Sequence, residues 1–122
     1  MKFEALEISL RIIRSLRGVL AKIRSRDSRL AGHIRDAASS AALNLGEGRR
    51  RVGKDRLHHY RISAGSADEV LTSLRVAEAW GYLSAKEIAE PARLLDKLLA
   101  ILWTLTNTTA LKRLKNIGPL VR

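Results

Sequence analysis

The sequence predicts an all-α protein, an antiparallel up-down-up-down four-helix bundle. Apolar residues recur at spacings of three and four, which is the period of an amphipathic helix. The β-branched runs are short, so the sequence contains no convincing strand. At 122 residues the chain is of single-domain size. We expect residues 1–110 to form the bundle and residues 111–122 to form a basic, flexible tail.

The first two helices are expected over residues 3–25 and 28–47, with Asp27 or Ser28 as the N-cap of the second. The inward face of the first helix carries Ala5, Ile12, Leu16, Val19, Leu20 and Ile23. The inward face of the second helix carries Leu30, Ile34, Ala37, Ala38, Ala41 and Leu45. Because its alanines are small, the second helix is expected to lie very close to a neighbouring helix.

The third helix is expected to start near Lys54 or Asp55 and to end near Trp80, before Gly81. Its inward face carries Leu57, Tyr60, Ala64, Ala67, Leu71 and Leu74. The middle of this helix, around Gly65, is built of small residues like the second helix. The second and third helices are therefore predicted to form a close antiparallel pair.

The fourth helix is predicted by the capping-box sequence Ser84-Ala85-Lys86-Glu87. Pro91 lies inside it, so we expect either a kink or a true start near Glu90. Its apolar residues exceed what one bundle core requires, and the surplus predicts an oligomer interface. The predicted interface residues are Leu94, Leu99, Ile101 and Trp103. The alternative is that Leu99 and Trp103 only cover the edge of the core.

A small-residue segment, residues 34–48, ends on Asn44, Glu47 and Gly48. Gly48 is expected to adopt the left-handed conformation that often ends a helix. Asn44 and Glu47 lie on one helix face, where they are expected to form a polar network with Arg35 or with the following loop. The alternative is that they orient a water molecule or a phosphate-bound ion.

The charge of the chain is strongly positive and unevenly placed. Lys and Arg number 23 against 12 Asp and Glu, a net charge of +11; residues 1–56 carry 14 basic and 6 acidic residues. Such a field concentrates polyanions, so RNA or DNA is the leading partner, and the alternative is a solvated surface. The candidate nucleic-acid-binding residues form two sets: Arg49, Arg50, Arg51, Lys54 and Arg56 in a loop, and Arg11, Arg14, Arg17, Lys22 and Arg24 on the first helix. No aromatic residue is interleaved with them, which favours contacts to the phosphate backbone over base stacking.

Several kinds of chemistry find no support in the sequence. Cysteine is absent, which removes thiolate metal ligands and cysteine nucleophiles and is typical of a reducing, cytoplasmic location. His58 and His59 are adjacent and cannot readily share a metal, while His33 stands alone. The loop has the spacing of a phosphate-binding P-loop, but Asp55 replaces the required hydroxyl residue. We therefore expect no catalytic residue, metal or cofactor, and no membrane-spanning segment.

Three blocks of the sequence match a known family. They are HIRDAASSAALNLGEG at residues 33–48, ISAGSADE at residues 62–69 and GYLS at residues 81–84. Over residues 3–106 the chain resembles the bacterial four-helix-bundle family of ribosomal RNA intervening-sequence proteins, whose superfamily includes the accessory variability protein of diversity-generating retroelements. It departs from the usual pattern at Asp36, at Ala42 and at Leu45-Gly46.

The resemblance implies a homopentameric barrel of such bundles with a basic surface. In the retroelement branch the barrel engages nucleic acid and a reverse transcriptase. Together with the charge, it favours a non-enzymatic oligomeric scaffold that binds RNA or DNA with little sequence selectivity. The alternative is a protein-interaction adaptor, for example an accessory subunit of a reverse transcriptase.

Overall fold

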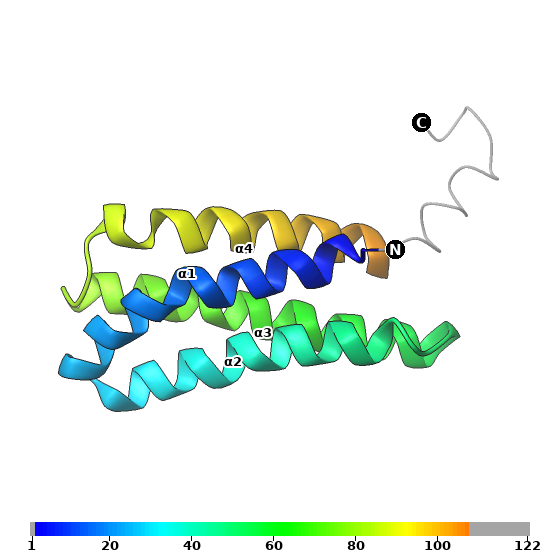
Figure 1. The fold of residues 1–122 in the computed structure, drawn as a ribbon, viewed down its shortest axis with the longest axis horizontal. Helices are drawn as coiled ribbons and strands as arrows, with labels where there is room; N and C mark the ends of the chain where they lie inside the picture. The colour runs from blue at the N-terminus through cyan, green and yellow to red at the C-terminus, as the bar shows by residue number, and fades with distance from the viewer. Residues whose placement is uncertain (1, 108–122) are drawn as a thin grey trace.

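The computed structural model describes residues 2–107, and these residues fold into four helices (Figure 1). The helices are α1 (Glu4–Arg26), α2 (Ser28–Gly48), α3 (Gly53–Ala79) and α4 (Ala85–Thr106). Each runs antiparallel to the next, and α1 and α3 both pack on α2 and α4. The described part of the chain contains no strand, so the predicted all-α bundle is confirmed. The predicted tail, residues 111–122, lies outside the described residues.

The core is formed by the inward faces of all four helices. Most residues predicted to face inward are buried, and Ile8, Val70 and Ala77 join them. Six predicted core residues are half-buried at the edge of the core instead: Val19, Leu20, Leu30, Leu57, Ala64 and Leu71. The centre of the bundle is filled largely by leucine, alanine and isoleucine.

The predicted interface on α4 divides into three environments. Leu94 is only 1% exposed and belongs to the core, so its assignment to an oligomer interface is wrong. Leu99 and Ile101 are half-buried against the core, whereas Trp103 is 60% exposed. The buried face of α4 is wider than expected because Leu94 and Leu95 are both fully enclosed by the other helices.

Helix starts agree with the predicted capping residues. The Asp27 side chain accepts a hydrogen bond from the Leu30 N–H at 3.0 Å, so Asp27 is the N-cap of α2. Ser84 and Glu87 form the complete capping box of α4. Because α4 begins at Ala85 and continues through the buried Pro91, the alternative start near Glu90 is wrong.

Glycine ends α3 but does not end α2 in the predicted manner. Gly81 has φ +82°, its N–H donates to the Glu78 carbonyl, and the Tyr82 N–H donates to the Ala77 carbonyl, which is a Schellman motif. Gly48 has no positive φ and is the last residue of α2. The left-handed role predicted for Gly48 is wrong.

The predicted close pair of α2 and α3 is confirmed, and this pair packs more extensively than any other in the bundle. The buried Ser63 hydroxyl donates to the Ala41 carbonyl at 2.8 Å. Gly48 permits the closest approach, because a Cβ there would lie 2.7 Å from Cε1 of Tyr60. Gly65, predicted to serve the same packing, is exposed and has open space around it. The prediction that Gly65 allows α2 and α3 to pack closely is therefore wrong.

Candidate nucleic-acid interface

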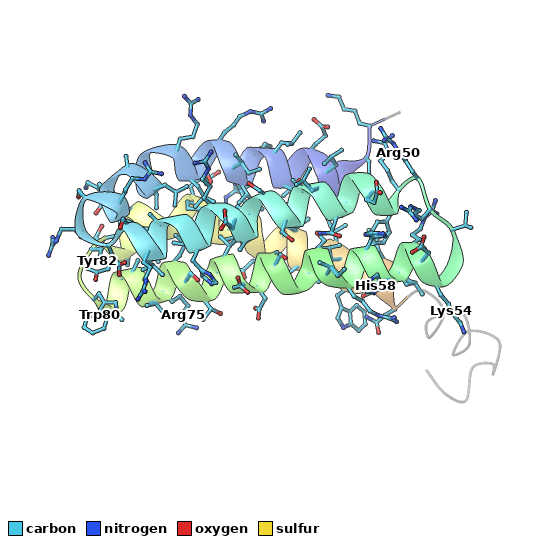
Figure 2. The ribbon with its side chains drawn as sticks, turned by 90° about the horizontal axis from the view of Figure 1, so that it is seen from below. Arg50, Lys54, His58, Arg75, Trp80 and Tyr82 are labelled. Atoms are coloured by element: carbon cyan, nitrogen blue, oxygen red, sulfur yellow. The ribbon has the colours of Figure 1, made fainter. Side chains whose placement is uncertain are left out.

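The α2–α3 loop lies at the end of the bundle where α1 begins. The rings of Phe3, just before α1, and Tyr60, in α3, have centroids 5.9 Å apart. Figure 2 shows Arg50 and Lys54 at this end, on opposite sides of the loop, and Trp80 and Tyr82 at the other end of the bundle. The loop therefore presents its cations at one end of the bundle.

Arg51 and Arg56 belong to the structure of the loop. Arg51 Nη1 donates to Asp55 Oδ2 at 2.8 Å and Nη2 donates to Glu47 Oε1 at 3.0 Å, and these hydrogen bonds raise the pKa of Arg51. Arg56 Nε donates to the Gly48 carbonyl at 3.2 Å and Nη2 donates to the Arg49 carbonyl at 3.1 Å. Arg51 bridges the two helix ends and Arg56 caps α2. Both were predicted to bind nucleic acid; each guanidinium uses two of its five N–H donors in these contacts, and their role in binding stays a prediction.

Asn44 and Glu47 join a polar network with the loop region. Glu47 binds Arg51, while Asn44 Oδ1 lies 3.0 Å from Nδ1 of His59 on α3. The partner His59 was not predicted, because nothing in the sequence fixes the register between α2 and α3. Arg35 has no part in this network; it is exposed on α2, so its predicted role here is wrong.

Three exposed cations in the loop or at the start of α3 have side chains that make no hydrogen bond in the described structure, and we call them the loop cations: Arg49, Arg50 and Lys54. The Arg49 guanidinium lies 5.8 Å from the centroid of the Phe3 ring, a cation–π contact that leaves its charge uncompensated. Within residues 2–107, neither Arg50 nor Lys54 forms an ion pair. A phosphate at this loop would meet these three side chains first.

The basic residues of α1 occupy different surroundings. Lys22 forms an ion pair with Glu87 at the start of α4, so its charge is partly compensated, and its predicted role in nucleic-acid binding stays a prediction. Arg11 and Arg14 lie beside Glu4 and Glu7 in a shallow hollow. The carboxylates reduce the positive field there, whereas Arg17 lies ten residues from the nearest acidic residues in the sequence, Glu7 and Asp27.

Arg17 and Arg24 meet Arg35 of α2 around one hollow of about 460 Å³. We call this the α1–α2 hollow. The sequence grouped Arg17 and Arg24 by their spacing on one helix and missed Arg35, which comes from another helix. Their shared surface is a product of the packing of α1 on α2.

The loop cations and the α1–α2 hollow do not form one continuous site. Phe3 contacts the loop end, and the rise of a helix places Arg17 about 20 Å further along α1. The bundle thus carries two separated basic surfaces, one at its end and one along its side.

The histidine and acidic side chains do not gather into a metal site. Among residues 2–107, no group of three His, Asp or Glu side chains is placed to hold a metal ion. His58 and His59 have ring centroids 5.7 Å apart in an edge-to-face arrangement. Separately, none of the described helices is long and apolar enough to cross a membrane.

The fold and its surface define a basic four-helix bundle. The family model described as 23S rRNA-intervening sequence protein matches residues 2–104, so the chain belongs to the family of 23S rRNA-intervening sequence proteins. The fold is similar to the crystal structure of a protein of unknown function from the S23 ribosomal protein family of Bacteroides thetaiotaomicron. The TM-score is 0.70 at 14% identity, and the match covers 84% of this chain and 94% of that one. No curated protein matches the chain.

Proposed function

We propose that this protein is a non-enzymatic, oligomeric scaffold that binds RNA or DNA through its basic surface with little sequence selectivity. We place it in the cytoplasm, in keeping with its lack of cysteine. Membership of the 23S rRNA-intervening sequence protein family is consistent with a role near RNA.

The observation that carries the proposal is the lack of internal compensation for the positive charge. Among the lysines and arginines of residues 2–107, only Lys22, Arg51 and Arg93 form ion pairs with carboxylates. The remaining basic side chains, most of which lie on helices, have no carboxylate partner within these residues, and a polyanion binding there would release condensed counterions. They would reach phosphates rather than base edges, which accounts for the low selectivity.

Self-association would multiply these modest interactions. We propose the homopentamer that the family resemblance implies, with Trp103 as the exposed centre of the interface and Leu99 and Ile101 beside it. Binding through several copies then gains affinity by raising the effective concentration of each basic surface.

The proposal is tested by titrating labelled single-stranded RNA, duplex RNA and DNA with the full chain at two salt concentrations. We expect binding at low salt, a steep loss at high salt, and similar affinities for unrelated sequences. Negligible binding at low salt, or binding that salt does not change, would contradict it.

A second candidate is a protein-interaction adaptor, such as an accessory subunit of a reverse transcriptase. The exposure of Trp80 (69%) and Trp103 (60%) favours it, because exposed tryptophans are typical of protein interfaces. Affinity capture with and without nuclease separates the two candidates. A specific protein that remains bound after nuclease supports the adaptor, and loss of all captured material supports the nucleic-acid scaffold.

A further inference from the structure

The α1–α2 hollow has the size of a small-ligand site. Its volume of about 460 Å³ falls in the range of clefts that hold small molecules. It lies on the side of the bundle, away from the loop cations, and so needs its own explanation.

The positive charge of the hollow is not compensated by acidic side chains in its lining. Its charged side chains are Arg17 and Arg24 of α1, two helical turns apart, and Arg35 of α2. Among residues 2–107, no acidic residue lines the hollow, and none of these arginines forms an ion pair or hydrogen bond. Three guanidinium groups held around one space favour an anionic ligand, and phosphate above all, since guanidinium binds it with two parallel hydrogen bonds.

The rest of the hollow is apolar with one free hydroxyl. Ile13 and Leu20, both half-buried, belong to its lining, and Ser39 supplies a hydroxyl that makes no hydrogen bond within the described part of the chain. An apolar lining beside phosphate-binding groups suits a ligand that carries both a phosphate and a flat ring. A nucleotide has this chemistry.

We propose that the α1–α2 hollow holds one unpaired nucleotide of a single-stranded nucleic acid, with its neighbouring phosphates on Arg17, Arg24 and Arg35. The base lies against Leu20 and Ile13, and arginine planes can also stack on it. This inference rests on the proposed function and assigns one nucleotide of the ligand to a defined site on the protein. A site for an unpaired base favours single-stranded ligands, whereas the rest of the basic surface interacts only with the charge of the phosphates.

Two other anionic ligands fit the hollow less well. A duplex keeps its bases paired and stacked, so it cannot place one in a hollow between two helices without the cost of unstacking. An acidic amphipathic helix requires a long groove with anchors over successive turns, and this hollow is compact. Charge alone would favour the duplex, because its phosphates are more densely spaced and release more counterions.

The test compares two variants that lose the same charge. Arg17→Ala/Arg24→Ala/Arg35→Ala removes the arginines of the hollow, and Arg29→Ala/Arg61→Ala/Arg75→Ala removes three exposed helical arginines elsewhere. Fluorescence anisotropy with labelled oligouridylate and with an RNA duplex of equal length gives the affinities, and circular dichroism verifies the helices. We expect the hollow variant to lose about tenfold or more in single-strand affinity and the control about threefold or less.

A third variant, Ser39→Leu, fills the hollow and removes no charge. We expect it to abolish the preference for the single strand while duplex binding persists. Equal losses in the two arginine variants, a wild-type preference for the duplex, or equal displacement of oligouridylate by polyglutamate would each overturn the inference and leave the proposed function standing. If the wild-type protein binds no nucleic acid at low salt, the proposed function itself fails.

Discussion

The ring of Tyr60 occupies the space that a side chain at residue 48 would need. A Cβ built on Gly48 lies 2.7 Å from Cε1 of Tyr60 and 3.1 Å from the Cβ of His59. Tyr60 is buried and its ring lies against Phe3, so it has little room to move. Gly48 is therefore required by the distance between α2 and α3 and not by backbone conformation.

Gly48→Ala is expected to lower the free energy of unfolding by about 1–3 kcal/mol, because the added methyl forces the helix pair apart. Thermal or urea unfolding followed by circular dichroism measures this. Gly65→Ala is the matched control: Gly65 lies inside α3 with open space around it, so alanine should stabilise the protein by about 0.5–1 kcal/mol. A Gly48→Ala protein as stable as the wild type would show that the helices separate at no cost.

Arg50, in the α2–α3 loop, and Arg56, in the first turn of α3, have different roles. Arg56→Ala removes two hydrogen bonds to the carbonyls that end α2, and we expect a loss of about 1 kcal/mol in stability. Arg50→Ala should leave the stability unchanged and weaken RNA binding. Unfolding curves and RNA titrations of both variants measure the two effects, and the reverse pattern would show that the roles are exchanged.

Glu87 couples α4 to α1 in a way that depends on pH. The hydrogen bond from Lys22, followed by that from the Ser84 N–H, lowers the pKa of Glu87 below its ordinary value of 4.5. Because the folded pKa is the lower one, the stabilisation is present above pH 4.5 and is lost as the pH falls through the folded pKa.

Glu87→Gln should therefore be less stable than the wild type at neutral pH, with a difference that shrinks under acidic conditions. Urea unfolding at a series of pH values follows it. Asp68→Asn removes an exposed carboxylate without an ion pair in the described structure and should change stability less at neutral pH. A Glu87→Gln difference that stays constant into strong acid would contradict this explanation.

Trp103 and Trp80 are exposed to a similar degree at opposite ends of the bundle. If Trp103 lies at the centre of the oligomer interface, Trp103→Ala should dissociate the oligomer, since such residues carry much of the binding energy of an interface. Trp80→Ala should leave it intact. Sedimentation velocity measures the assembly, and a wild-type monomer or equal effects of both variants would rule out this interface.

The helices could be predicted because their signals are local. The capping box at Ser84 and the inward alanines of α2 depend only on nearby sequence, and both agree with the structure. The site depended on the register between helices, which local patterns do not fix. The ion pairs of Arg51 with Glu47 and Asp55 could have been expected from their spacing of four residues, whereas the meeting of Arg35 with Arg17 could not.

The salt dependence of single-stranded RNA binding tests the central claim, that the exposed arginines and lysines bind phosphates, most directly. The slope of log Kobs against log salt concentration is measured for the wild type and for Arg49→Ala/Arg50→Ala/Lys54→Ala. We predict a clearly negative slope for the wild type, and for the variant a slope shallower by about 0.7 for each phosphate that it no longer neutralises. A wild-type affinity independent of salt, or an unchanged slope in the variant, would contradict the claim.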